Sequence, residues 1–495
     1  MIVCRLLLLC CSEFLLSQAL MTPRGRVQFG QPAWSTQNVY KFGSNANASI
    51  FDVTDFGAVG DGKTDNTQAF QSALDAANKT LGGTGFLISS GNFLFSGSLT
   101  VPAAVTLQGT YKSVPSHTPG QNPADTPTDG TVLMPTGGKG NESGSPFITI
   151  SRDSVLCGVT IYYPGQPGNQ TPTPFPWTIV LGGNNAAVTD IECLNCFNAV
   201  RAVGAARHYI ARIQGQPINT GIYVDETYDI GRVEDVHWNP WYSYNKDYIG
   251  WQLLHGRAFV FARTDWEYVF NTFAFGYAIG YHFLASTKGS CNGNFLGIGA
   301  DMATNASVQV DAADTFGILI TNGEFTAFGS PYGVDSSQIV VSSSNKGTLR
   351  LVNSAFWGPS NSIAKIAGSG TTGFGDCTFS QWDHDKKGRH AIEVDGATGN
   401  LLVTNSDFQQ DGNQVDLGST LARAVITGNV IQGSTRVSGK ARNTQIGLNA
   451  DVESCFARHS NCLEAAKAFS SINDFKILNI RTGITLTPRK HPFST

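Results

Sequence analysis

The residues best suited to acid–base chemistry lie in one short segment, Ala262–Tyr268. As a β-strand it would alternate, so that Arg263, Asp265 and Glu267 share one face. Because unpaired charges do not point into an apolar core, we expect this face to line an outer groove. Carboxylates two residues apart in a strand stand roughly 6.5–7 Å apart, near the separation that inverting glycosidases use. We therefore predict Asp265 and Glu267 as a general acid and base, with Asp301 as a third candidate catalytic carboxylate.

Aromatic residues precede this segment in a stretch without strand alternation, Trp238–Trp251. Sugar rings have apolar faces that stack on aromatic side chains, so we predict a substrate platform of Trp238 and Trp241 with His237 beside them. Arg263 is predicted to bind a carboxylate or sulfate group of the substrate. Two structural alternatives stay open. Arg263 could form a surface ion pair with its neighbouring carboxylates, and the aromatic residues could anchor a loop.

The elements that position these residues follow from the spacing of apolar side chains. A helix is predicted over residues 64–78, with a capping-box-like start at Thr64-Asp65 and an apolar stripe of Ala69, Phe70, Ala73, Leu74 and Ala77. From about 84 to 450, short apolar strands alternate with Gly, Asn, Asp and Ser turns. The group Asn-x-x-Phe, or a close variant, recurs every 22–31 residues, at Asn322, Asn353, Gly375, Asn405 and Gly428. We predict a solenoid of stacked β-coils whose open end is covered by the helix. The stretches Val114–Gly144 and Trp238–Trp251 are predicted loops.

Composition sets further expectations. Charged residues make up only 14% of the 495 residues, and 55 are glycine, which suits short strands and tight turns. The net charge of −4 provides no electrostatic footprint for nucleic acid or an anionic membrane.

The sequence also indicates export from the cell and the bounds of the domains. Residues 1–20 have the pattern of a secretory signal peptide, and glycosylation sequons begin at Asn47, Asn78, Asn141, Asn169 and Asn305, so we predict a secreted glycoprotein. We expect an irregular lead-in over 21–50, the solenoid domain over 51–450, and a helical cap or tail over 451–495.

The segment Phe51–Asn78, FDVTDFGAVGDGKTDNTQAFQSALDAAN, resembles the amino-terminal signature of the pectate-lyase superfamily, in particular its rhamnogalacturonase/epimerase-like domain. The resemblance implies an all-β fold, a right-handed parallel β-helix, over roughly residues 50–450. It does not identify the reaction, because the same opening occurs in polysaccharide hydrolases, lyases, epimerases and phage tail spikes. The Asn-Thr-Asp, Asp-Asp and Gly-His-Gly motifs of polygalacturonases are missing, and Asp301 is followed by Met302. No catalytic residue therefore carries over by motif.

These features favour cleavage of glycosidic bonds in an extracellular, uronate-containing polysaccharide by a two-carboxylate hydrolase. A lyase or epimerase acting on uronates is the alternative, with Arg263 or His237 in its site and Ca²⁺ held by acidic residues. A non-catalytic glycan-binding solenoid is the third hypothesis, and it predicts an aromatic and polar groove without a close acidic pair. Under the leading hypothesis we expect a polysaccharide as partner, no cofactor or metal, no nucleic acid or membrane, and a monomer.

Overall fold

The computed structural model describes residues 50–79, 84–87, 89–117 and 123–452, together with two short earlier strands. The chain divides into two compact units, Met1–Ser49 and Ile50–Thr495. In the first, β1 (Ala19–Met21) and β2 (Val27–Phe29) form an antiparallel pair. The rest of the predicted signal peptide and lead-in, and the predicted carboxy-terminal helix, lie outside the described residues. None of the described helices has the length and hydropathy needed to cross a bilayer.

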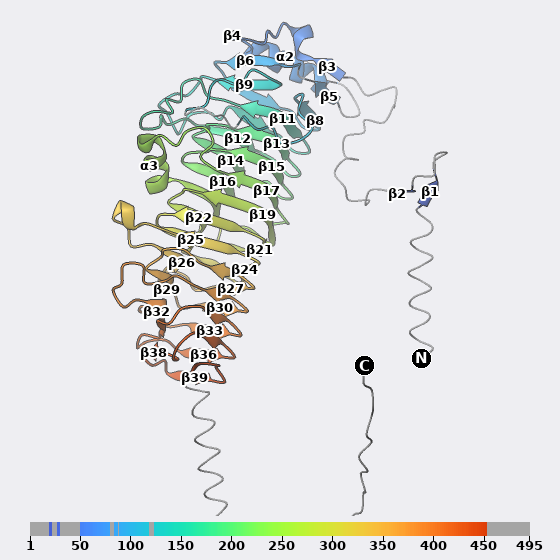
Figure 1. Cartoon of the computed structure of the whole chain (residues 1–495). Coiled ribbons are helices and arrows are strands. Elements are labelled where there is room, and N and C mark those ends of the chain that lie inside the picture. Colours follow the sequence, from blue (N-terminus) through green and yellow to red (C-terminus); the bar gives the residue numbers. More distant parts are fainter. Residues whose placement is uncertain are drawn as a thin grey trace, which may run out of the picture. The chain divides into compact units, whose positions relative to one another are not determined.

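An amphipathic helix, α2 (Thr67–Asn78), lies at the amino-terminal end of the second unit (Figure 1). The predicted apolar stripe is confirmed by buried side chains at Phe70, Ala73, Leu74 and Ala77. The predicted start at Thr64 is wrong, because Asp61–Asp65 forms strand β4 and pairs with β6 (Gly91–Phe95). Asn66 follows this strand, and its side chain bonds the main chain of Val59 instead of capping the helix.

The second unit is a solenoid of parallel strands arranged in three sheets (Figure 1). Sheet 1 is formed in order by β3 (Ile50–Asp52), β5 (Thr84–Leu87), β8 (Val105–Gln108), the first halves of β11 (Val155–Ile161), β13 (Ala187–Cys193), β15 (Tyr209–Gly215), β17 (Arg232–Trp238) and β19 (Glu267–Phe275), then β21 (Cys291–Leu296), β24 (Ala313–Thr321), β27 (Thr348–Val352), β30 (Thr371–Gly375), β33 (Asn400–Thr404), β36 (Arg423–Thr427) and β39 (Asn443–Gly447).

Sheet 2 is formed by β4, β6, β9 (Thr131–Pro135), the second halves of β11 to β19, then β22 (Gly299–Ala303), β25 (Glu324–Ala327), β28 (Ala355–Phe356), β31 (Thr378–Phe379), β34 (Asp407–Phe408) and β37 (Val430–Ile431). Sheet 3 is 13-stranded and runs through β7 (Leu99–Val101), β10 (Ile148–Ile150), β12 (Trp177–Leu181), β14 (Asn198–Val203), β16 (Thr220–Asp225), β18 (Arg257–Phe261), β20 (Ile279–Phe283), β23 (Ala306–Val310), β26 (Ser337–Val341), β29 (Ser362–Ile366), β32 (His390–Val394), β35 (Asn413–Asp416) and β38 (Val437–Ser438). The predicted all-β, right-handed parallel β-helix is confirmed.

A single residue with left-handed backbone makes the corner between sheet 1 and sheet 2. Its φ lies between 48° and 75° at Gly158, Asp190, Arg212, Asp235, Asn271, Gly297, Asn322, Asn353, Asp376, Asn405 and Gly428. Glycine adopts this conformation freely, and Asn and Asp adopt it more readily than other side chains. Three residues beyond these corners, the rings of Phe325, Phe356, Phe379 and Phe408 stack in the core, with centroids 4.6–5.8 Å apart from one coil to the next. The recurring Asn-x-x-Phe group is therefore structural, as predicted.

We expect Asn353→Ala to lower the free energy of unfolding by about 1–2 kcal/mol. Alanine has no polar group to offset the left-handed backbone, and the bond from Asn353 Nδ2 to Asn322 Oδ1, 2.8 Å long, is lost. Asn353→Gly is the control, because glycine keeps the conformation and loses only the hydrogen bond. Urea unfolding measures both variants, and an equal loss in the two would contradict a conformational role for this corner.

The two predicted loops contain regular structure. Thr131–Pro135 lies inside the first and forms β9, in which every residue is buried, so the prediction of a surface loop throughout is wrong there. The second contains α3 (Lys246–His255), whose first turn is capped by Asn245 Oδ1 accepting from the Asp247 N–H at 3.0 Å. Its polar and aromatic residues lack strand alternation because a helix occupies them.

Candidate functional site

The segment Ala262–Tyr268 is not one strand, which corrects the basis of the predicted acid–base pair. β18 ends at Phe261 and β19 begins at Glu267, and the residues between them turn the corner from sheet 3 to sheet 1. Asp265 and Glu267 therefore do not share a strand face. The side chain of Asp265 is 43% exposed, whereas that of Glu267 is completely buried.

Glu267 belongs to an internal ion pair. Its Oε1 lies 3.0 Å from Nε2 of His208, which is also completely buried, and His208 Nδ1 lies 2.9 Å from the carbonyl oxygen of Ala205. Burial opposes the charged form of His208, but the charge of Glu267 and these hydrogen bonds outweigh it and raise the pKa of His208. Glu267 has no surface from which to reach a polysaccharide.

The remaining predicted carboxylates lie apart from each other. Asp265 Oδ1 accepts from Asn292 Nδ2 at 3.0 Å, and its Oδ2 lies 4.0 Å from Arg263 Nη2. This is the surface ion pair that the sequence left open as an alternative. Asp301 lies in the middle of β22 in sheet 2, where its Oδ1 accepts from Thr326 Oγ1 at 2.6 Å.

The predicted aromatic platform is largely internal. Trp238 ends β17 and is fully buried, so its prediction as a substrate-stacking residue is wrong. His237 is half-buried on the outer side of sheet 2, with its ring 4.7 Å from that of Trp241 and 5.1 Å from that of Phe273. Burial lowers the pKa of His237. The arrangement packs His237 between rings, which agrees with the loop-anchoring alternative.

A different group of reactive side chains lies on the outer face of sheet 3. Arg201, Tyr223, Val260 and His282 occupy one register position on β14, β16, β18 and β20. Each lies between two fully buried core residues, so strand alternation turns it away from the core. Val260 is itself fully buried and His282 is only 8% exposed, so the row is open to solvent at Arg201 and Tyr223 and covered at its other end. Neighbouring strands are about 4.8 Å apart, which sets Tyr223 one strand from Arg201 and two strands from His282.

Tyr223 is the centre of this outward row. Its hydroxyl donates to Asp225 Oδ2 at 3.2 Å, and its ring lies 6.2 Å from that of Trp177. Burial and the adjacent Asp225 raise the pKa of Tyr223 to about 12, while the positive charges of Arg201 and Arg257 act in the opposite direction. Tyr223 is therefore a protonated donor at neutral pH, close to two guanidinium groups that would stabilise its anion.

The imidazole of His282 is oriented by a carboxylate, that of Asp311. Its Nε2 lies 2.7 Å from Asp311 Oδ2, and Nδ1 is buried with no hydrogen-bond partner among the described residues. Burial opposes ionisation of Asp311, but hydrogen bonds from His282, Ser342 and Gln309 outweigh it and lower the pKa of Asp311 to about 2. An ionised Asp311 fixes the proton of the imidazole on Nε2 and leaves Nδ1 free to act as a base.

The sequence contained one signal for this site. Arg201, Tyr223 and His282 each interrupt an apolar strand, in NAVRAV, TGIYVD and IGYHF. A polar residue between two core positions of a strand faces outward, and three such residues within four successive coils would form a row that is interrupted by Val260. What the sequence could not provide was the register, because the loops between these strands differ in length.

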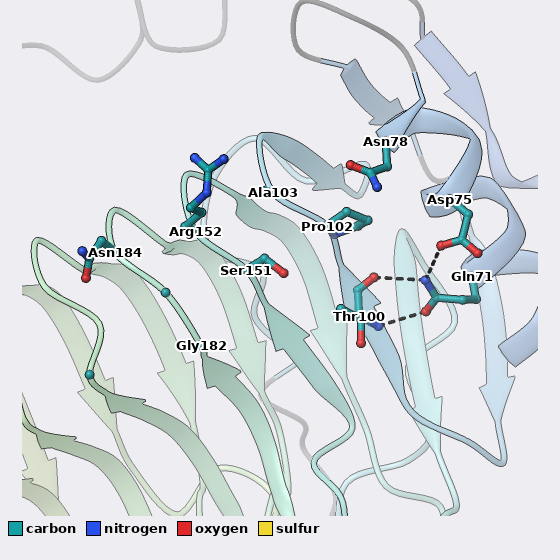
Figure 2. Close-up of a pocket in the computed structure, with 12 residues that line it drawn as sticks. Gln71, Asp75, Asn78, Thr100, Pro102, Ala103, Ser151, Arg152, Gly182 and Asn184 are labelled. Carbon is teal, nitrogen blue, oxygen red and sulfur yellow. Dashed lines mark hydrogen bonds between the residues drawn. The ribbon is translucent and has the colours of Figure 1, made fainter.

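A hollow of about 830 Å³ lies at the amino-terminal end of the solenoid (Figure 2). Gln71 and Asp75 of α2 form one side of it, and Arg152 and Asn184 come from corners of two coils. The amide of Gln71 bonds Asp75 at 3.0 Å and both main-chain groups of Thr100 at 3.0 and 3.2 Å. These contacts hold the capping helix against the first coils, so we interpret the hollow as the junction between α2 and the solenoid and not as a binding site.

A loop crosses the outer face of sheet 2 and is held by a buried carboxylate. Glu192 Oε1 accepts from the main-chain N–H of His117 at 2.7 Å, and Oε2 accepts from Thr160 Oγ1 at 3.0 Å and contacts His117 Nδ1. Tyr111 lies next to His117, with its hydroxyl 3.3 Å from Nε2. The hydrogen bond to Glu192 raises the pKa of His117, against the effect of burial.

We expect His117 to stabilise the fold more at pH 5.5 than at pH 8.5. A histidine whose pKa is raised on folding contributes fully below its unfolded value of 6.5 and loses that contribution as pH rises through the raised value. His117→Asn keeps a donor for Glu192 but does not titrate. The difference in melting temperature between wild type and His117→Asn should therefore shrink at the higher pH. A difference that is constant over this range would contradict the prediction.

Comparison with known proteins agrees with the fold. A family model described as rhamnogalacturonase A/epimerase, pectate lyase-like, matches residues 50–153. Residues 50–153 are thus pectate lyase-like in sequence, at the amino-terminal end of a parallel β-helix. Alginate lyase 7 of Azotobacter vinelandii is 45% identical over 65 residues, and mannuronan C5-epimerase AlgE3 of the same organism is 43% identical over 136 residues.

These relatives match this pectate lyase-like chain over short stretches. The stretches cover 12% and 24% of this chain, and only 8% and 7% of the two relatives. Among solved structures, the A-module of mannuronan C-5 epimerase AlgE6 from A. vinelandii is 13% identical, with 81% of this chain and 99% of that chain covered and a TM-score of 0.40. The family 28 exopolygalacturonase of Yersinia enterocolitica is 13% identical, with 82% and 79% covered and a TM-score of 0.38.

Two arginine side chains supply the positive charge near Tyr223. Arg201 is half-buried on β14, and Arg257 is half-buried at the start of β18. In the part of the chain that the structure describes, no group of three or more His, Cys, Asp or Glu side chains is arranged to hold a metal ion.

Proposed function

We propose that this protein removes the proton next to the carboxylate of a uronate unit in an anionic polysaccharide, as a lyase or as a C5-epimerase. The observation that carries the proposal is the outward row on sheet 3, in which Tyr223 bonds Asp225 and is the register neighbour of Arg201, with the charge of Arg257 at the start of β18 also acting on it. The local identity to an alginate lyase and a mannuronan C5-epimerase supports the same chemistry.

The chemistry assigns one role to each side chain. Arg201 and Arg257 bind the uronate carboxylate and stabilise the charge that develops on it when the C5 proton leaves. His282 accepts that proton on Nδ1, which requires the covered ring to leave its contact with Asp311 and turn toward the substrate. In a lyase, the C5 electrons then form the C4–C5 double bond, the bond from C4 to the glycosidic oxygen breaks, and Tyr223 protonates the leaving oxygen. In an epimerase, Tyr223 instead returns a proton to C5 from the opposite face.

The proposal replaces hydrolysis as the leading hypothesis for a geometric reason. Hydrolysis by two carboxylates needs an acid and a base that both face the sugar, about 5–9.5 Å apart. Glu267 is completely buried, and Asp265 and Asp301 lie in different parts of the coil.

Export remains part of the proposal. The described sequon residues Asn78, Asn141, Asn169 and Asn305 are all exposed, which supports a glycosylated, secreted protein.

The test is a panel of alginate, polygalacturonate and neutral glucans incubated with the full-length protein in D₂O. Three products are followed together: new reducing ends, ultraviolet absorbance of unsaturated uronate ends, and deuterium at C5 seen by NMR. Unsaturated ends identify a lyase, and deuterated units of changed configuration without new ends identify an epimerase. New reducing ends without unsaturated ends or deuterium at C5 would contradict the proposal and would indicate that the protein is a hydrolase. Binding without any product would favour the glycan-binding solenoid.

A further inference from the structure

Aromatic side chains are displayed at the corner where sheet 3 passes into sheet 1. Tyr228 is 53% exposed, Trp266 is 58% exposed and Tyr268 is 39% exposed. Tyr228 and Trp266 come from consecutive coils, because Thr227 and Thr264 form a parallel bridge and the Asp265 N–H donates to the Thr227 carbonyl at 2.8 Å. These side chains provide the exposed aromatic surface that the buried Trp238 does not.

Trp266 is held in its exposed position by specific contacts. Its φ is +58°, a conformation that is strained for a bulky side chain. The N–H of Trp266 donates to Asn292 Oδ1 at 2.9 Å, and Asn292 Nδ2 donates to Asp265 Oδ1 at 3.0 Å. Burial of the indole does not offset the strain, because more than half of it faces solvent.

The corner is continuous with the outward row on sheet 3. Asp225 bonds residues of both. Its Oδ2 accepts from the Tyr223 hydroxyl at 3.2 Å, and its Oδ1 accepts from the main-chain N–H of Arg263 at 2.9 Å. The guanidinium carbon of Arg263 lies 5.2 Å from the centre of the Tyr228 ring. Arg263 Nη1 is buried and has no acceptor among the described residues, so the corner retains an unmet hydrogen-bond donor.

We propose that this corner is a second binding site for an anionic polysaccharide, outside the outward row. The apolar faces of two sugar rings stack on Trp266 and Tyr228, and Arg263 is placed for a carboxylate on one of them. The choice of an acidic sugar rests on the proposed function, while the stacking does not. A glycan fits better than a second copy of the chain, because each ring has a charged or amide neighbour and the aromatic area is small for a stable dimer.

The experiment is affinity electrophoresis of the full-length protein in native gels that contain alginate, polygalacturonate or a neutral glucan. The test variant is Trp266→Asn, because asparagine adopts a positive φ readily and so removes the ring without adding backbone strain. Trp266→Phe keeps a stacking ring. Trp357→Asn is the matched control, since Trp357 is 46% exposed but follows β28, several coils away.

We expect a polyuronate to retard the wild type. Trp266→Asn should bind it with a dissociation constant about tenfold higher and should have the melting temperature of the wild type. Trp266→Phe and Trp357→Asn should bind as the wild type does. The kcat on the same polyuronate should be unchanged in Trp266→Asn, because Trp266 has no role in the proposed proton transfer. The inference would be overturned if Trp266→Asn were retarded as strongly as the wild type, or if no polymer retarded the wild type. It would also be overturned if light scattering showed the wild type as a dimer and Trp266→Asn as a monomer. Retardation that depends on Trp266 without any turnover would support the corner site and contradict the proposed chemistry.

Discussion

Tyr223→Phe should lower kcat on the preferred polyuronate by about 10²–10⁴-fold, the range typical of a lost acid–base group. The substitution removes one oxygen atom, the donor to Asp225 at 3.2 Å, and leaves the ring beside Trp177. Because Arg201 and Arg257 keep their places, KM should change little. The pKa of Tyr223, about 12, also predicts that its ionisation removes no activity as pH rises through the neutral range.

The matched control for this prediction is Tyr209→Phe. Tyr209 lies on sheet 1, its hydroxyl donates to Glu234 Oε2 at 3.0 Å, and burial with Glu234 raises its pKa to about 12. It therefore has the same local chemistry as Tyr223 on a different face of the solenoid. Steady-state kinetics of both variants separates a catalytic hydroxyl from a structural one. Equal losses in the two variants, or full activity of Tyr223→Phe, would remove Tyr223 from the mechanism.

The fold was predictable from the sequence because local signals repeat in every coil. Left-handed corners favour Asn, Asp or Gly, with Arg212 as the exception in the corners named above, and the stacked Phe325, Phe356, Phe379 and Phe408 lie three residues after four of them. The apolar stripe of α2 was equally clear. The start of that helix was not, because the pairing of Asp61–Asp65 with β6 is a long-range contact that overrides a local capping pattern.

The candidate site depended on information that local patterns do not hold. Arg263, Asp265 and Glu267 have the spacing of a strand face, but the corner between sheets falls inside their segment and turns Glu267 into the core. The sequence shows no partner for Glu267, since His208 lies in an earlier coil. Arg201 and Tyr223 look unremarkable alone, and they form a site only when the register of sheet 3 places them side by side.

The buried pair of His208 and Glu267 predicts a large loss of stability for a single substitution. We expect Glu267→Ala to lower the free energy of unfolding by about 3–5 kcal/mol, because it leaves the buried imidazole of His208 without its charge partner and hydrogen-bond acceptor. The two side chains are completely buried and 3.0 Å apart, so solvent does not compensate for the loss. The double variant His208→Leu/Glu267→Leu should recover much of the loss, since two apolar side chains leave no buried charge.

The pH dependence of the same pair has a definite sign, and it separates a structural Glu267 from a catalytic one. The raised pKa of His208 means that its stabilising effect is complete below the unfolded value of 6.5 and is lost as pH rises through the raised value. Urea unfolding should therefore show a larger gap between wild type and Glu267→Ala at pH 6 than at pH 9. Near-normal turnover by folded Glu267→Ala at low temperature would assign the carboxylate to the core. Loss of turnover without loss of stability would instead restore Glu267 as the acid or base that its spacing from Asp265 suggested.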